Sequence, residues 1–166
     1  MTDLETADPL ALRTAMTDQL VREGTIRSTQ VEAAFRTVPR HAFAPEAELS
    51  RAYAAHDAVS TKVNEHGISI SSVSAPVVQA RMLEQAEIES DMRVCEVGSG
   101  GYNAALMAEL VGPDGSVVTI DIDPDVTGRA RMLLDSAGYS HVRVVLADAE
   151  NGLPDAGTVV SQVLED

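Results

Sequence analysis

Apolar positions in the first half of the chain recur three and four residues apart, the spacing that predicts amphipathic helices. Three stripes of this kind follow one another, and their members are Leu12, Ala15, Met16 and Leu20; Val31, Ala34, Phe35 and Val38; and Val78, Met82, Leu83 and Ala86. Gly24 and Pro39 end the first two predicted helices, and Pro76 begins the third. Residues 39–74 carry many Ser and Thr, with Pro and Gly, and are predicted to be irregular.

The pattern changes in the second half, where short apolar runs alternate with helical stripes. Residues 92–97, 117–121 and 142–146 are typical of buried strands, and helices predicted over 104–111 and 123–137 separate them. This alternation predicts parallel β-α-β units, in which each helix returns the chain to the same end of the sheet. The fold class is therefore α/β with a parallel sheet.

Composition and charge exclude several classes of protein. The 166 residues are 45% hydrophobic, but no apolar run approaches the ~20 residues that a membrane helix needs. A net charge of −14 repels phosphate backbones, which argues against a nucleic-acid partner. The single cysteine, Cys95, cannot form an internal disulfide, and the acidic N-terminus lacks a signal-peptide pattern. These features predict a cytoplasmic protein without a membrane segment.

The sharpest chemical signal is a glycine-rich turn between the first predicted strand and the following helix. Gly98 and Gly100 leave room for a ligand to approach the backbone, because glycine has no Cβ. Asp121 follows at close to the ~20-residue spacing of a ribose-binding acid. Asp148 follows the third strand and reaches the same sheet edge, where an adenine could be bound. The alternative is an ordinary tight turn with a solvated acid behind it.

The residues around this turn discriminate between nucleotide cofactors. A dinucleotide fingerprint needs a third glycine where this chain has Asn103, and no P-loop lysine is present. Glu96, next to the turn, suits a cationic ligand better than a diphosphate. S-adenosylmethionine carries a sulfonium and an ammonium and no phosphate, so it fits best. A nicotinamide-dependent oxidoreductase is the less favoured alternative.

Three sequence blocks, in order, resemble the protein-L-isoaspartate O-methyltransferase family. Residues 38–43 read V-P-R-H-A-F and are similar to that family's V-P-R-x-x-F. Residues 72–76 read S-V-S-A-P and resemble its T-I-S-x-P substrate loop. Residues 96–100 read E-V-G-S-G and resemble its cofactor motif. The resemblance covers nearly all of residues 10–152, and the wording around the glycine turn looks closer to a subgroup associated with lanthipeptide biosynthesis in actinobacteria.

The resemblance implies a Rossmann-like parallel sheet of three to four strands with helices on both faces, preceded by an N-terminal helical segment. Residues 1–74 would form that segment and the substrate loop, and residues 75–166 a partial S-adenosylmethionine-binding domain. The family continues beyond the Asp148 segment with a fourth strand and two or three more. Residues 158–164 are expected to supply one more short strand, and the later strands are expected to be missing.

The implied function is methyl transfer from S-adenosylmethionine to an isoaspartyl or aspartyl carboxylate of a protein or peptide. A carboxylate is already ionised at neutral pH, so it needs alignment and no general base. The resemblance assigns Ser74 to hold the acceptor carboxylate and Ser72 to assist; the alternative for Ser74 is a helix N-cap before Pro76. The expected cofactor-binding residues are Glu96, Gly98, Ser99, Gly100, Asp121, Ile122, Asp148 and Ala149.

Other residues receive structural interpretations. Tyr102 stands where the family usually has glycine, and it is expected to add a side chain beside the methionine part of the cofactor. The four histidines lack ligand spacing, so no metal site is expected, and Cys95 is predicted to be a core residue. A truncated, non-catalytic module that binds cofactor or peptide is the alternative function.

Overall fold

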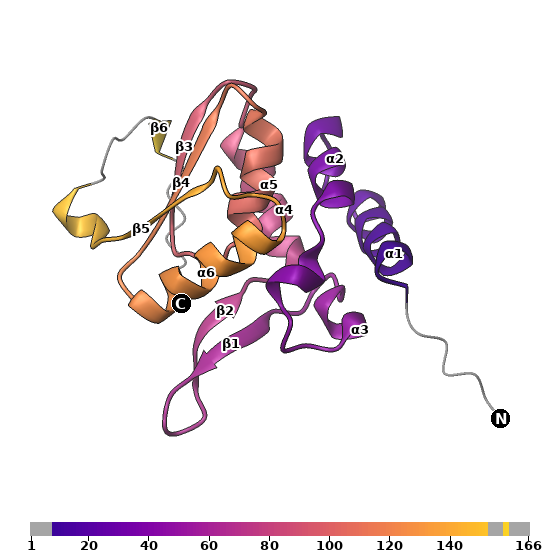
Figure 1. Cartoon of the computed structure of the whole chain (residues 1–166). Helices are drawn as coiled ribbons and strands as arrows, with labels where there is room; N and C mark the ends of the chain where they lie inside the picture. The colour runs from indigo at the N-terminus through magenta and orange to yellow at the C-terminus, as the bar shows by residue number, and fades with distance from the viewer. Residues whose placement is uncertain (1–7, 153–157, 160–166) are drawn as a thin grey trace.

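The structure is a computed structural model that describes residues 8–152 and 158–159 (Figure 1). Within these residues a parallel sheet stands beside a group of helices, and a separate hairpin extends below them. The helices are α1 (Pro9–Arg22), α2 (Thr29–Thr37), the 3₁₀ helix η1 (Arg40–Phe43), α3 (Leu49–Ala52), α4 (Pro76–Ala86), α5 (Tyr102–Val111), α6 (Pro124–Ser136) and the 3₁₀ helix η2 (Ala149–Asn151). The strands are β1 (Val59–Val63), β2 (Ser69–Val73), β3 (Arg93–Val97), β4 (Ser116–Asp121), β5 (Arg143–Leu146) and β6 (Thr158–Val159).

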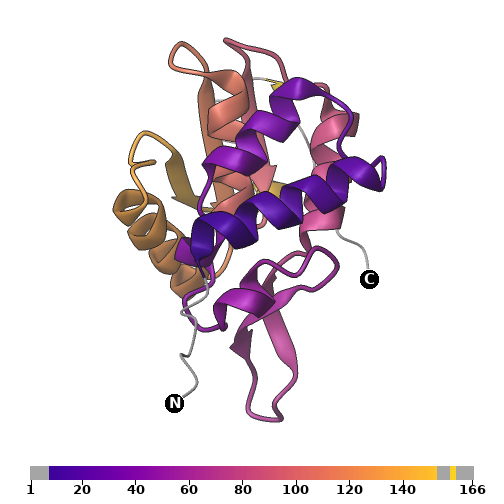
Figure 2. The ribbon, with the colours of Figure 1, turned by 90° about the vertical axis from the view of Figure 1, so that its right-hand side faces the viewer.

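The larger sheet has the strand order β5-β4-β3-β6, and its described pairings are all parallel. This confirms the predicted α/β class, because α5 and α6 connect successive strands and pack against them. The carboxyl ends of β3, β4 and β5 meet at one edge of the sheet, as parallel pairing requires. Helices α4, α5 and α6 lie on the side of the sheet that also bears α1 and α2 (Figures 1 and 2), and helices on the opposite face stay a prediction.

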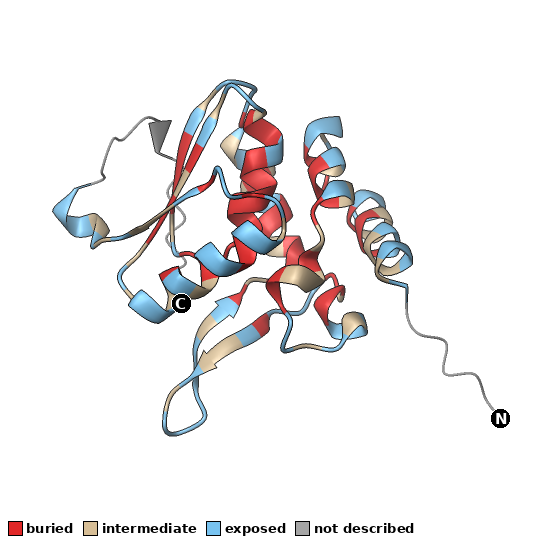
Figure 3. Cartoon of the chain, viewed as in Figure 1, coloured by how far each residue is buried: buried red, intermediate tan, exposed pale blue. Residues whose placement is uncertain are grey.

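The N-terminal helices share the hydrophobic core of the sheet domain. Phe35 of α2 and Phe43 of η1 are fully buried, and both lie against the ring of Tyr102 at the start of α5. Figure 3 shows the buried positions running along α5, which lies between the sheet and α2. Cys95 is buried in β3, as predicted. Within the described ranges, no helix combines the length and apolar character needed to cross a membrane.

Residues 39–74 are more regular than the sequence pattern predicted. They contain η1, α3 and an antiparallel hairpin in which Val59 pairs with Val73 and Ser60 with Ser72. The hairpin escaped prediction because Ser and Thr at half of its strand positions make its two strands look like a loop. It projects from the body of the molecule in Figures 1 and 2, and β2 leads directly into Ser74 and α4.

Candidate functional site

A cavity of about 450 Å³ lies where the carboxyl ends of β3, β4 and β5 face the end of β2. Every site residue predicted from the sequence lines it, namely Ser72, Ser74, Glu96, Gly98, Ser99, Gly100, Asp121, Ile122, Asp148 and Ala149. The sequence did not predict the other lining residues as site residues, and these are Ser71, Val73, Gln79, Val97, Asn103, Val126, Ala147 and Glu150. The structure thus brings the predicted acceptor loop and the predicted cofactor loop to one cavity.

The glycine turn has a backbone shape that side chains would strain. Gly98 has φ +97°, and its N–H donates to the carbonyl oxygen of Ile120 at 2.8 Å. Gly101 has φ +86°, and a Cβ at this position would lie 3.1 Å from the Phe43 ring. Both positions therefore require glycine. Gly101 packs against the Phe43 ring, while Gly98, Ser99 and Gly100 line the cavity.

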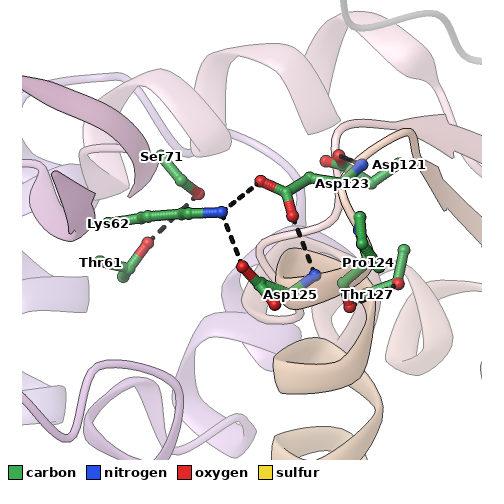
Figure 4. Close-up of polar contacts among 8 residues, drawn as sticks. All are labelled: Thr61, Lys62, Ser71, Asp121, Asp123, Pro124, Asp125 and Thr127. Carbon is green, nitrogen blue, oxygen red and sulfur yellow. Dashed lines mark hydrogen bonds and ion pairs between the residues drawn. The ribbon is translucent and has the colours of Figure 1, made fainter. Parts of the chain in front are cut away.

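Asp121 organises the turns on either side of it. One carboxylate oxygen accepts a hydrogen bond from the Ser99 backbone N–H at 3.0 Å, and the other accepts from the Asp123 N–H at 2.9 Å. The side chain of Asp123 in turn caps α6 by accepting from the Asp125 N–H (Figure 4). Each Asp121 oxygen keeps a further lone pair, so the carboxylate can also accept from two neighbouring hydroxyl groups of a ligand.

Glu96 is a buried carboxyl group, with 2% of its surface exposed. Burial raises its pKa to about 8, against hydrogen bonds from Asn103 and Thr119 that lower it, while the charge of Asp121 adds to the rise. Asn103 is itself buried, and its Oδ1 has no hydrogen-bond partner among the described residues. A buried acid and an unpaired acceptor in one cavity suit a ligand that donates hydrogen bonds and carries positive charge.

The raised pKa of Glu96 predicts a pH dependence of stability. Between about pH 4.5 and pH 8 the folded chain keeps a proton on Glu96 that the unfolded chain releases, so the free energy of unfolding falls as pH rises. E96Q should remove this fall, since glutamine does not titrate. Urea unfolding near pH 5 and near pH 8.5 measures it, with E89Q as the exposed control. An E96Q profile parallel to that of the unsubstituted protein would contradict the buried protonated state.

The acceptor loop between β2 and α4 leaves the Ser74 hydroxyl available. The N-cap of α4 is Ala75, which makes no side-chain capping bond, so the alternative of Ser74 as an N-cap is wrong. The Ser74 hydroxyl makes no hydrogen bond to any other described residue, although its carbonyl oxygen does. A Cβ on Gly100 would lie 3.8 Å from the Ser72 carbonyl oxygen, so the acceptor loop and the glycine turn are near neighbours.

Arg40 holds the backbone of the acceptor loop in place, a role that the sequence did not predict. Its fully buried guanidinium donates to the Ala52 carbonyl at 2.7 Å, to the Ser74 carbonyl at 2.9 Å and to Gln79 Oε1 at 3.0 Å. It also lies 4.9 Å from the centre of the Tyr102 ring. No carboxylate pairs with it in the described part of the chain, and burial lowers its pKa. The V-P-R block marked the residue, but nothing local indicated its three distant partners.

Tyr102 does not enter the cavity, so the expectation that it crowds a ligand there is wrong. Its side chain is fully buried between Phe35 and Phe43, on the core side of the first turn of α5. Asn103, one position further along the helix, lines the cavity instead. His41 lies outside the cavity, with Nδ1 2.7 Å from the Tyr53 hydroxyl, and has a structural contact.

The far end of the cavity is formed after β4 and β5. Ile122 is 71% exposed and contributes an apolar surface beside Asp121. Asp148 accepts a hydrogen bond from the Glu150 N–H at 2.9 Å and thereby begins η2, whose first residue is Ala149. An exposed apolar side chain next to a carboxylate can contact a flat, hydrogen-bonding ring.

A sequence model of the family described as protein-L-isoaspartate(D-aspartate) O-methyltransferase matches residues 11–158. The chain belongs to this family. Curated protein-L-isoaspartate O-methyltransferases from Ignicoccus hospitalis and Methanothermobacter thermautotrophicus are 41% and 36% identical to it over 141 and 144 residues. These matches cover 82% and 86% of this chain but only 62% and 63% of the relatives. The chain thus spans about three-fifths of the length of these isoaspartate methyltransferases.

Solved structures of protein-L-isoaspartate O-methyltransferases share the fold. One has a TM-score of 0.79 at 28% identity, over 91% of this chain and 48% of that one. A Plasmodium falciparum protein of the same description, crystallised with S-adenosyl-L-homocysteine, has a TM-score of 0.66 at 18% identity, over 81% of this chain and 62% of that one. The second likeness concerns the fold alone. Together they confirm the expected Rossmann-like architecture.

Proposed function

We propose that this protein transfers a methyl group from S-adenosylmethionine to an isoaspartyl or aspartyl carboxylate of a protein or peptide. Its membership of the isoaspartate methyltransferase family supports this proposal. The observation that carries it is the meeting of two loops at one cavity: the loop bearing Ser72 and Ser74, and the glycine turn with its surrounding acids.

The residues of the cavity fit S-adenosylmethionine. The unpaired Oδ1 of Asn103 would receive the ammonium group of its methionine part together with Glu96, which would give up its proton as the cation binds. Asp121 would accept from the two ribose hydroxyls, and the segment of Asp148 and Ala149 would border the adenine. When bound, S-adenosylmethionine supplies a methyl group on a sulfonium, which a carboxylate takes without any proton transfer.

The chain's own task is then to bind and align the acceptor. A peptide carboxylate is ionised at neutral pH, so no general base is required of the cavity. Ser74, and Ser72 beside it, would donate hydroxyl hydrogen bonds to this carboxylate and fix its direction of approach. The loop is suited to this task because the buried Arg40 and Gln79 hold its backbone, which leaves the Ser74 hydroxyl free of other described partners.

Calorimetric titration with S-adenosylhomocysteine, followed by a methyl-transfer assay, tests the proposal. We expect binding, and transfer to an isoaspartyl peptide at a higher rate than to the same peptide with a normal aspartyl linkage. Absence of binding at millimolar ligand would contradict the cofactor assignment. Binding without transfer to either peptide would instead favour a cofactor- or peptide-binding module, and binding of NADH would favour the oxidoreductase alternative.

S74A is expected to weaken binding of an isoaspartyl peptide about 10- to 100-fold, because a hydrogen bond to a charged group contributes about 1.5–3 kcal/mol. The affinity for S-adenosylhomocysteine should change less than about twofold, since the substitution leaves the glycine turn intact. Calorimetry on the protein saturated with S-adenosylhomocysteine measures the first quantity. The exposed Ser90 provides the matched control, S90A. Equal peptide affinity in S74A and S90A would remove Ser74 from the acceptor site.

A further inference from the structure

The only lysine of the sequence, Lys62, bridges two elements that border the cavity. It extends from β1 toward the start of α6, where its Nζ lies 2.6 Å from Asp123 Oδ2 and 3.0 Å from Asp125 Oδ2 (Figure 4). The side chains of Lys62 and Asp123 are about one-third exposed, at 32% and 33%. One ammonium therefore joins the hairpin to two carboxylates of another element at the edge of solvent.

On the hairpin side, the position of Lys62 fixes that of the acceptor loop. Lys62 is paired in register with Ser71 of β2, and the neighbouring Thr61 hydroxyl lies 3.3 Å from the Ser71 hydroxyl. Ser72 follows Ser71 within β2, and Ser74 follows the end of that strand directly. A movement of Lys62 away from α6 would therefore carry the acceptor serines with it.

On the other side, the bridge ends on the turn that shapes Asp121. Asp123 caps α6 through the Asp125 N–H, and its own N–H donates to Asp121 Oδ1 at 2.9 Å. The second oxygen of Asp121 holds the glycine turn through Ser99. Lys62 thus contacts Asp123, which lies two residues along the chain from Asp121, the carboxylate that the proposed function assigns to the ribose.

A second cavity of about 240 Å³ lies beside this bridge. Lys62 and Asp125 line it from opposite elements, and Ser71, Ser99, Gly100 and Val126 line both this cavity and the main one. The bridge therefore borders a second cavity whose lining overlaps that of the main cavity.

We propose that Lys62 is a positioning residue that couples cofactor binding to acceptor binding. The proposal rests on the function proposed above. Hydroxyl groups of the cofactor that bind Asp121 fix the turn bearing Asp123 and Asp125. These two carboxylates hold the ammonium group of Lys62. Lys62 in turn holds the hairpin so that Ser74 faces the cofactor. By thermodynamic linkage, the acceptor peptide strengthens cofactor binding by the same factor as the cofactor strengthens peptide binding.

Peptide affinity with and without S-adenosylhomocysteine tests the coupling. The coupling ratio is the peptide affinity with saturating S-adenosylhomocysteine divided by the peptide affinity without it. Because exposed ion pairs are individually weak, we expect a modest ratio of about fivefold in the unsubstituted protein. K62M should lower the coupling ratio to about one, while the affinity for S-adenosylhomocysteine in the absence of peptide should change less than about twofold. K62R should restore most of the ratio. The matched control is R81M, which removes an exposed charge from the middle of α4, outside the lining of both cavities, and should retain the full ratio.

Chemical acylation provides a second measurement, because Lys62 is the chain's only side-chain amine. Its pKa is raised by hydrogen bonds to Asp123 and Asp125, so the bridge should slow acylation of Nζ. D125N should speed this acylation severalfold, and S-adenosylhomocysteine should slow it in the unsubstituted protein. Mass spectrometry of peptides separates Lys62 from the N-terminal amine.

Two results would overturn the role of Lys62 alone: an unchanged coupling ratio in K62M, or equal acylation rates in D125N and the unsubstituted protein. Both leave the proposed function intact, provided that S-adenosylhomocysteine binds. Failure of S-adenosylhomocysteine to bind the unsubstituted protein would contradict the proposed function itself. The two failures are therefore distinguishable in the same set of titrations.

Discussion

R40M is expected to lower the free energy of unfolding by about 3–5 kcal/mol. Methionine fills a similar volume but donates no hydrogen bond, so the Ala52 carbonyl, the Ser74 carbonyl and the Gln79 side-chain oxygen would lose their common donor inside the protein. Each buried acceptor left unpaired costs about 1–3 kcal/mol. Relief of the buried positive charge offsets part of this loss. What remains is a large share of the ~5–15 kcal/mol that stabilises a typical domain.

Urea unfolding monitored by circular dichroism measures the effect of R40M. The matched control is R36M, because Arg36 makes its ion pairs with Asp18 and Glu32 at the surface. R36M should lower the free energy of unfolding by no more than about 1 kcal/mol. R40K keeps the charge but lacks the planar fork that reaches three separate acceptors, so it should fall between the two. A stability of R40M equal to that of R36M would show that the buried guanidinium contributes no net stability.

D121N is expected to weaken S-adenosylhomocysteine binding about 100-fold. The carboxylate already accepts from the N–H groups of Ser99 and Asp123, one on each oxygen. An asparagine would turn its NH₂ group toward one of these donors, which disturbs one turn, and it would lose the charge that strengthens hydrogen bonds from ribose hydroxyls. The first effect acts on the free and the ligand-bound protein, and the second on the ligand-bound state.

Calorimetry at neutral pH measures this affinity, and D135N is the control because Asp135 is exposed near the end of α6, away from the cavity. D135N should bind S-adenosylhomocysteine as the unsubstituted protein does. A parallel urea titration of D121N separates loss of affinity from loss of fold. An affinity of D121N within about threefold of the control would remove Asp121 from the cofactor site.

The sequence predicted the carboxyl edge of the sheet well because topology alone determines it. Once three parallel strands are recognised, Gly98, Asp121 and Asp148 must approach one another, whatever the side chains around them do. The parallel sheet and the grouping of the predicted site residues around one cavity follow from this rule. The roles of those residues toward a ligand stay predictions.

The parts that were missed depend on contacts between distant segments. The hairpin of β1 and β2 has few apolar residues, so its strands carry no clear period-two signal. The partners of Arg40 and Lys62 lie far along the chain and are selected by side-chain geometry. Tyr102 was placed wrongly because the direction of a side chain at a helix start depends on what packs beneath it, here Phe35 and Phe43.

The contact of Phe35 and Phe43 with Tyr102 has a consequence for how the chain folds during synthesis. The N-terminal helices leave the ribosome first, but Phe35 and Phe43 contact Tyr102 only after α5 has been synthesised. Gly101 likewise takes its place against Phe43 only when both segments are present. Because such non-local contacts form late, the ligand-binding turn is expected to acquire its shape in one cooperative step with the N-terminal segment. Neither half of this chain would then serve as an autonomous module that evolution could exchange for another.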